Sequence, residues 1–214
     1  YGFHVHVVGD TIVDAYTRST LIGGQTKTPT FSVLYQGEDK YIGGAGIVAK
    51  HLSAAGAKVT FTTVLGDDPL RKYVENSFKN SKIKLNAIVD KTRPTTNKNV
   101  IVADNYRLLK VDKLDNTPIS KDIFYKINKS IKNTKVNSVI FSDFRHGIFN
   151  KSTIKGLSNS INKNVFKVAD SQVATRWGNI SEFQEFDLIT PNEKEARFTL
   201  GDQDSSIGIL AKKI

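Results

Sequence analysis

Short runs of β-branched residues alternate along the chain with stretches of about 10 to 15 residues that have helical periodicity. This alternation is typical of a largely parallel sheet covered by helices, and it predicts an α/β fold with a doubly wound core. The expected strands are 3–8, 59–65, 136–141, 166–169 and 188–190. The expected helices are 44–55, 69–80, 121–133, 151–161 and 193–200.

Two stretches interrupt the alternation, residues 16–42 and 93–112, where strand-like pieces follow one another without a helix between them. Such pieces are expected to pair antiparallel, and the turn at residues 103–106 (ADNY) is a hairpin signal. We therefore predict a small β-rich lid attached to the core of a single domain. Because an exposed strand edge is a ready template for pairing, the lid is the candidate surface for a homodimer.

Composition narrows the class of protein. A chain of 214 residues with 39% hydrophobic and 24% charged residues has enough apolar material for one folded domain. The absence of cysteine excludes disulfides, thiolate metal sites and cysteine nucleophiles. No uncharged apolar run approaches the roughly 18 residues of a membrane-spanning helix, so we expect a soluble cytoplasmic protein without a membrane partner.

The net charge of +10 is compatible with nucleic acid, a membrane surface or small anionic substrates. The lysines are spread through Lys/Asn-rich stretches such as 121–135 and 159–167, which are typical of solvated helix faces. They are not interleaved with aromatic residues, and no nucleic-acid-binding motif occurs. We therefore expect no nucleic-acid partner.

Polar residues follow the expected strands where each one ends. They are Asp10 and Asp14 after the first strand, then Asp143, Asp170 and Asn192 after later ones. Ligands of open α/β sheets bind beyond the carboxyl ends of the strands, where a carboxylate can orient a sugar hydroxyl or hold Mg²⁺ through water. Each of these residues, taken alone, is equally typical of a helix cap.

A glycine-rich turn at residues 43–46 (GGAG) opens one expected helix and would allow a ligand or another segment to approach the backbone. Starting at Gly44, with Ala49 and Asp67 behind it, the same segment imitates a dinucleotide-binding fingerprint. Against that alternative, residues 36–42 form a poor buried strand and the motif does not follow the first strand. A purely structural turn is the other alternative.

Two further patterns have structural alternatives. Asn192 and Glu195 fit a helix capping box, which does not exclude a role beside metal-bound water. His4 and His6 point to one face of a strand and could form a metal pair, but without an acidic partner nearby we interpret both as structural. The phosphate-binding loop of nucleotide hydrolases and the nucleophile elbow of serine hydrolases do not occur.

Motifs in a fixed order cover nearly the whole chain and resemble the ribokinase-like, PfkB-type carbohydrate kinases. The later ones are similar to the branch that includes the heptose 7-phosphate kinases. In chain order they are 8–14 (VGDTIVD), 43–49 (GGAGIVA), 64–68 (VLGDD), 93–98 (RPTTNK), 108–112 (LLKVD), 142–147 (SDFRHG) and 190–196 (TPNEKEA).

The resemblance implies transfer of a phosphoryl group from ATP, with Mg²⁺, to a sugar or sugar phosphate. It implies that Asp14, Gly43 and Gly44 contact the sugar, that Lys98 faces the substrate from the lid, and that Asp143 forms the floor of the site.

For the nucleotide, the resemblance implies that Asn192 and Glu195 lie near the phosphates, with Glu195 reaching Mg²⁺ through water. Asp170 is a second candidate for the metal.

The chain departs from the family pattern in three places. Ile47 stands where the family usually has asparagine, and residues 21–30 (LIGGQTKTPT) differ from the heptose-kinase pattern. The Gly-Ala-Gly-Asp motif that supplies the anion hole and the catalytic base does not occur in the 214 residues. We therefore expect one incomplete kinase domain over residues 1–214 that lacks its C-terminal portion and its catalytic base and is inactive as it stands. The alternative function is non-catalytic sugar binding or regulation.

Overall fold

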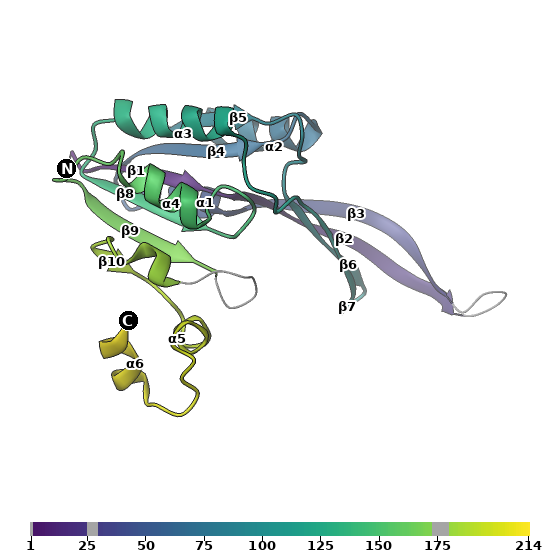
Figure 1. Ribbon diagram of the computed structural model, residues 1–214. Coiled ribbons are helices and arrows are strands. Elements are labelled where there is room, and N and C mark those ends of the chain that lie inside the picture. Colours follow the sequence, from purple (N-terminus) through teal and green to yellow (C-terminus); the bar gives the residue numbers. More distant parts are fainter. Residues whose placement is uncertain (1, 25–29, 173–179) are drawn as a thin grey trace.

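Six parallel strands form the central sheet (Figure 1). The computed structural model describes residues 2–24, 30–172 and 180–214. The central strands lie in the order β10-β9-β8-β1-β4-β5 and pair parallel throughout. Their bounds are β1 His4–Gly9, β4 Lys58–Leu65, β5 Ile83–Val89, β8 Ser138–Asp143, β9 Phe166–Ser171 and β10 Leu188–Ile189. The predicted α/β fold is confirmed, and β5 is a strand that was not predicted.

The first five helices follow the predicted ranges closely, except that α4 ends three residues early; the sixth has no predicted counterpart. They are α1 Ala45–Ala54, α2 Pro69–Lys79, α3 Lys121–Asn133, α4 Lys151–Ser158, α5 Glu193–Leu200 and α6 Ile207–Lys213, with a short 3₁₀ turn, η1, at Ile180–Phe183. The helices α5 and α6 lie beyond the edge strand β10 (Figure 1).

Polar caps explain where two of these helices begin. The side chain of Asp68 accepts a hydrogen bond from Arg71 N at 3.1 Å, and Pro69 occupies the first position of α2, where its missing N–H costs nothing. The side chain of Ser120 caps α3 in the same way by accepting from Ile123 N.

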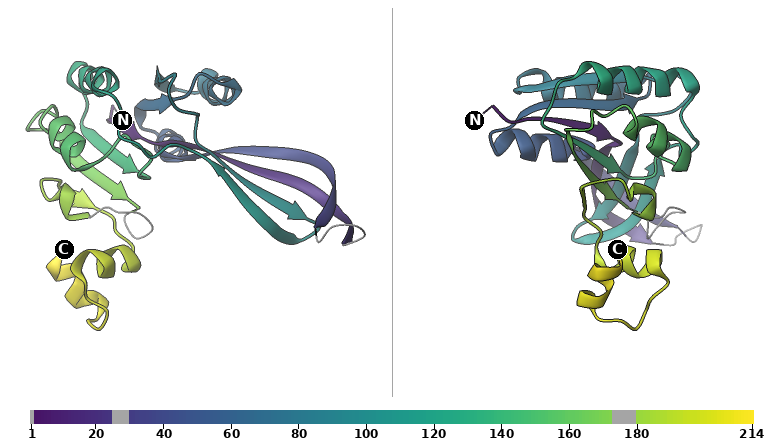
Figure 2. Two further views of the ribbon diagram at one scale, coloured as in Figure 1. Left: turned by 45° about the vertical axis from the view of Figure 1, so that its right-hand side comes forward. Right: turned by 60° about the vertical axis from the view of Figure 1, so that its left-hand side comes forward.

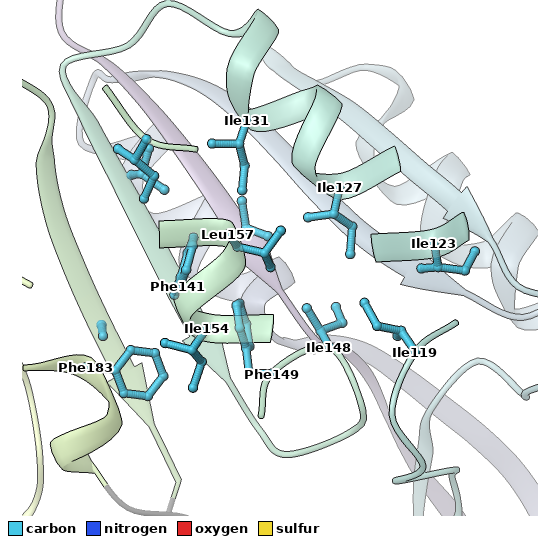
Figure 3. Close-up of a cluster of buried hydrophobic side chains, with 14 of the residues drawn as sticks. Ile119, Ile123, Ile127, Ile131, Phe141, Ile148, Phe149, Ile154, Leu157 and Phe183 are labelled. Carbon is cyan, nitrogen blue, oxygen red and sulfur yellow. The ribbon is translucent and has the colours of Figure 1, made fainter. Parts of the chain in front are cut away.

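The core lies on both faces of the central sheet. On one face, Ile123, Ile127 and Ile131 recur every fourth residue of α3 and pack with α4 on the sheet, where Phe141 contacts Phe149 with ring centroids 4.9 Å apart (Figure 3). On the other face, α1 and α2 cover a second cluster of buried residues that includes Phe61.

A second sheet, here called the projecting sheet, extends away from the core (Figure 2). Its strands are β2 Thr11–Gly24, β3 Phe31–Gly44, β6 Asn97–Ala103 and β7 Tyr106–Lys113, in the order β3-β2-β6-β7. One residue, Asp10, lies between the end of β1 in the core and the start of β2 in the projecting sheet. Residues 25–29 of the predicted lid segment lie outside the described residues.

The predicted antiparallel pairing holds for only part of this sheet. The strands β2 and β3 pair antiparallel, and so do β6 and β7 on either side of the predicted hairpin turn, but β2 and β6 pair parallel, with Val13 opposite Asn97. Asp14 does not stand at the end of a strand but lies inside β2. Residues 36–42, predicted to be a poor buried strand, belong to β3, which is largely exposed and therefore lacks the apolar run that marks a core strand.

None of the helices that the structure describes has the length and apolar character needed to cross a membrane.

Candidate active site

The strands β2, β3 and β6 bring three predicted residues together where the projecting sheet meets the core. In the sheet register Asp14 lies opposite Lys98 of β6 on one side and Tyr41 of β3 on the other. The carboxylate of Asp14 also lies directly over Gly43, because a methyl group at Gly43 would be 2.2 Å from Asp14 Oδ2. Glycine at position 43 therefore makes room for the carboxylate, and Asp14, Gly43 and Lys98 form one group.

Charged side chains continue this row across the projecting sheet. Asp112 of β7 lies opposite Lys98, and Lys110 lies two residues along β7 on the same face. Partial burial raises the pKa of Asp14 above its usual range, and the charges of Lys98 and Lys110 oppose that rise. The row thus presents carboxylates that accept hydrogen bonds beside two cations that can pair with an anion.

Asp143, the last residue of β8, is buried and enclosed by polar partners. Its Oδ2 accepts a hydrogen bond from Ser171 Oγ at 2.7 Å and pairs with Arg145 Nε at 2.9 Å, and Arg145 also pairs with Glu182. Burial raises the pKa of Asp143 to about 6, against the opposing effects of Arg145 and Ser171.

Asp10 lies beside Asp143 on the neighbouring strand end and is the second buried carboxylate of this edge. Its Oδ2 accepts hydrogen bonds from Phe144 N at 3.0 Å and His146 N at 3.2 Å. Burial, and then repulsion from Asp143, raises the pKa of Asp10 to about 7. A cation or a proton donor placed here would meet two carboxylates that burial has made unusually basic.

The start of α5 supplies the third group of predicted residues. Asn192 and Glu195 form the capping box expected from the sequence: Glu195 N donates to Asn192 Oδ1 at 3.0 Å, and Asn192 N donates to Glu195 Oε2 at 2.8 Å. Burial raises the pKa of Glu195 above its usual range and the nearby charge of Asp170 adds to the rise. Asp170 in turn accepts a hydrogen bond from Thr190 Oγ1 at 3.0 Å.

The predicted residues therefore form groups along one edge of the central sheet. Gly44 links two of them, because Asp10 O accepts a hydrogen bond from Ala45 N directly after this glycine, at 2.9 Å. The α5 group lies farther along the edge, beyond β9. The structure brings Asp14 and Glu195 into no mutual contact.

His4 and His6 have threonine partners. His4 Nε2 lies 2.9 Å from Thr60 Oγ1, and His6 Nε2 lies 2.8 Å from Thr62 Oγ1. These contacts fit the structural interpretation of both histidines.

Sequence reasoning assigned no role to the buried residues that hold this edge together, Asp10, Arg93 and Arg145 among them. Asp10 was visible as a carboxylate at a strand end, and Arg93 as the first residue of the RPTTNK motif. Nothing local to Arg145 signals that it adopts the left-handed conformation, with φ of 57°.

The sequence of this chain is similar to those of known carbohydrate kinases. The model of the pfkB family carbohydrate kinases matches residues 3–213. Among curated relatives, the bifunctional protein HldE of Helicobacter pylori strain P12 is 32% identical over 216 residues, covering 97% of this chain and 45% of that protein. HldE of Aliarcobacter butzleri strain RM4018 is 29% identical, with 97% and 44% covered. The chain thus spans less than half the length of these relatives.

Solved structures share the fold at low sequence identity. Phosphofructokinase-2 of Escherichia coli, in its tetrameric inhibited form, superimposes with a TM-score of 0.72 at 14% identity, over 99% of this chain and 68% of that one. Arabidopsis thaliana ribokinase complexed with ribose and ATP gives 0.70 at 15% identity, over 99% and 67%. The ribokinase-like fold expected from the motifs is confirmed.

Proposed function

Because the chain belongs to the pfkB family of carbohydrate kinases, we propose that its protein transfers the terminal phosphoryl group of ATP to a hydroxyl of a sugar or sugar phosphate. The observation that carries the proposal is the placement of Asp14 over Gly43, opposite Lys98 and next to the carboxyl edge of the central sheet. Phosphoryl transfer depends mainly on positioning and charge neutralisation, so a site of this kind needs oriented acceptors and cations more than a reactive nucleophile.

At the sugar end, Asp14 would accept hydrogen bonds from sugar hydroxyls while Gly43 and Gly44 let the ring approach the backbone. Lys98, with Lys110 on the same face, would pair with a phosphate already present on the substrate. Asp143 would form the floor. A substrate that carries a phosphate, such as a heptose 7-phosphate, fits this charge arrangement better than an uncharged sugar.

At the nucleotide end, we assign Asn192 and Glu195 to the phosphates and their Mg²⁺. Oxygen ligands suit Mg²⁺. Burial, and to a smaller degree the charge of Asp170, raises the pKa of Glu195, and a cation bound nearby would favour its ionised form. Within the described residues no cluster of three or more acidic or histidine side chains could hold a metal alone. Mg²⁺ commonly keeps several waters and phosphate oxygens as ligands, so Glu195 would reach it through water, with Asp170 as a second candidate.

The catalytic base is not assigned to any residue of this sequence. The Gly-Ala-Gly-Asp motif that the family uses does not occur in the 214 residues. We therefore expect these residues by themselves to bind sugar weakly and to turn over no ATP.

The projecting sheet is our candidate for a homodimer interface. Leu109 and Val111 of β7 are 57% and 47% exposed, and because side chains alternate along a strand they lie on the opposite face from Lys110 and Asp112. Tyr106 at the tip is 75% exposed. An apolar face turned away from the charged row is the pattern of a surface covered by a second copy.

Size-exclusion chromatography with light scattering tests the dimer. Replacing Leu109 and Tyr106 with serine should shift the protein to a monomer. Tyr125→Ser on α3 is the matched control, since Tyr125 is 65% exposed but lies far from this sheet. A wild-type monomer at tens of micromolar would contradict the proposal.

The kinase proposal is tested by a phosphorylation screen with the polypeptide expressed from its complete reading frame. ATP consumption is measured with hexoses, heptoses and their phosphates, in wild type and Asp14→Asn. Turnover on one sugar class that Asp14→Asn abolishes would support the kinase. Calorimetric sugar binding without ATP consumption would instead favour the non-catalytic alternative, for which Ile47 in place of the family's asparagine is the supporting observation.

A further inference from the structure

Asp10 forms hydrogen bonds with three separate segments at the point where the projecting sheet leaves the core. Its N–H donates to Ser142 O of β8 at 3.2 Å, and its carbonyl accepts from Ala45 N at the start of α1 at 2.9 Å. Its carboxylate accepts the N–H groups of Phe144 and His146, which follow β8. A residue with only 4% of its surface exposed thus joins β8, the segment after it and the glycine turn.

The backbones at this point touch, so the segments cannot shift independently. A methyl group at Gly9 would lie 2.2 Å from Ser142 O, and one at Gly44 would lie 2.3 Å from Asp10 O. Gly44 also has φ of 59°, a left-handed conformation in which glycine is not strained. The position of Asp10 therefore fixes where the turn carrying Gly43 and Gly44 lies relative to β8.

Segment 144–148 is held from its other side by a second ion pair. Arg93 pairs with Asp90 at 2.8 Å and donates to His146 O at 3.3 Å. The peptide groups of His146 are thus bound on the N–H side by Asp10 and on the carbonyl side by Arg93. Arg145 within this segment has φ of 57°, and a strained backbone of this kind persists only where its surroundings over-determine it.

The chemical nature of the anchor favours a functional role. A neutral acceptor could take the same N–H bonds, yet the chain places a carboxylate here, beside that of Asp143. The charges that face it are Asp143 on β8 and, through Asp143, Arg145 with its partner Glu182. Paired buried carboxylates are costly, and they concentrate at functional sites.

We infer that Asp10 is a positioning residue of the proposed kinase site: its carboxylate holds segment 144–148, and its backbone carbonyl holds the glycine turn. It touches no substrate itself. Through Gly44 it sets the place of the Asp14 and Gly43 group, and through Phe144 and His146 it sets the segment that continues from Asp143. This inference rests on the proposed function, because the arrangement matters for catalysis only if sugar and phosphate meet there.

Amide hydrogen exchange measures the anchor without any assay of activity. In the wild type, the amides of Phe144 and His146 should exchange as slowly as those of β8, although they lie outside any strand. In Asp10→Ala, which removes the acceptor, they should exchange roughly 10- to 100-fold faster, as expected for loss of a hydrogen bond to a charged group. Fast exchange of both amides in the wild type overturns the inference, even if the variant does not fold.

Steady-state kinetics show whether Asp10 affects catalysis or only holds the backbone in place. They are measured on the protein expressed from its complete reading frame. Asp10→Ala should lower kcat on the order of 10-fold and leave the KM for ATP within about twofold, because the nucleotide group on α5 does not contact Asp10. The control is Asp68→Ala, which likewise removes a carboxylate that accepts two backbone N–H groups, those of Arg71 and Thr95, and which should leave kcat unchanged.

The outcomes of the two inferences differ. An active wild type whose kcat is unchanged in Asp10→Ala refutes the positioning role alone. A wild type that phosphorylates no sugar in the screen refutes the proposed function and the positioning role together.

Discussion

Replacing Asp10 with asparagine should make the protein more stable at alkaline pH. Burial and the charge of Asp143 raise the pKa of Asp10 from 3.8 to about 7. At about 1.4 kcal/mol per pH unit, the ionised carboxylate then opposes folding by about 4 kcal/mol at pH 8. At pH 5 only the pH interval from 3.8 to 5 contributes, and the ionised carboxylate opposes folding by about 2 kcal/mol.

The sign follows from which state holds the proton. Because the folded state keeps the proton of Asp10 to a higher pH than the unfolded state does, the wild type is progressively destabilised as pH rises from about 4 through 7. Asparagine does not titrate, so the variant escapes this loss. The free energy of unfolding of Asp10→Asn should therefore gain roughly 2 to 3 kcal/mol on the wild type between pH 5 and pH 8.

Urea unfolding followed by circular dichroism at pH 5, 6, 7 and 8 measures this difference. Asp68→Asn is the control: although burial acts to raise it, hydrogen bonds from Thr95 and Arg71 hold the pKa of Asp68 below its usual range. The stability difference between wild type and Asp68→Asn should therefore not change with pH from 5 to 8. A difference for Asp10→Asn that is equally flat would refute the reasoning, because Asp10 would then ionise like an exposed aspartate.

Three further predictions concern the sugar end, the metal and the core. Asp14→Ala should weaken sugar binding roughly 10- to 100-fold in calorimetry and leave nucleotide binding nearly intact; equal loss of both would indicate a structural role. Glu195→Gln, which can still reach back to its cap, should keep the melting temperature but raise the Mg²⁺ concentration needed for activity, and an unchanged Mg²⁺ dependence would leave only the capping box. Phe141→Ala should cost about 3 to 5 kcal/mol in urea unfolding, since Phe141 is fully buried, whereas Tyr125→Ala should cost under about 0.5 kcal/mol.

The central sheet was predictable because burial on both faces leaves a readable pattern. The strand β8 contains the apolar run VIF, and α3 has isoleucine at every fourth residue between a serine cap and a polar end. The edge strand β5 escaped because it alternates lysine and asparagine with apolar residues, which is the pattern of a partly exposed strand. Local sequence therefore predicts a strand well where both faces of that strand are buried, and less well at the edge of the sheet.

The candidate site was predictable only as a set of residue types. The motifs name Asp14, Lys98 and Gly43 as residue types. The parallel pairing of β2 with β6, which brings Asp14 opposite Lys98, is set by contacts remote in sequence. The role of Asp10 depends on the backbone N–H groups of Phe144 and His146, which no side-chain pattern reveals. The sequence therefore shows which side chains are available for a site, but not which residues each of them contacts.

The parallel pairing of β2 with β6 also dictates the order in which the projecting sheet can be completed during synthesis. The hairpin of β2 and β3 is finished at Gly44, but its next partner begins at Asn97. At 5 to 20 residues per second, a ribosome needs roughly 3 to 11 s to supply the intervening segment. Throughout that interval the edge of β2 in the nascent hairpin has no partner strand. Apolar residues lie near the tip of the hairpin, among them Phe31 of β3, which is 72% exposed in the folded chain. The translation rate across residues 45–96 therefore sets how long chaperones must shield this hairpin from aggregation.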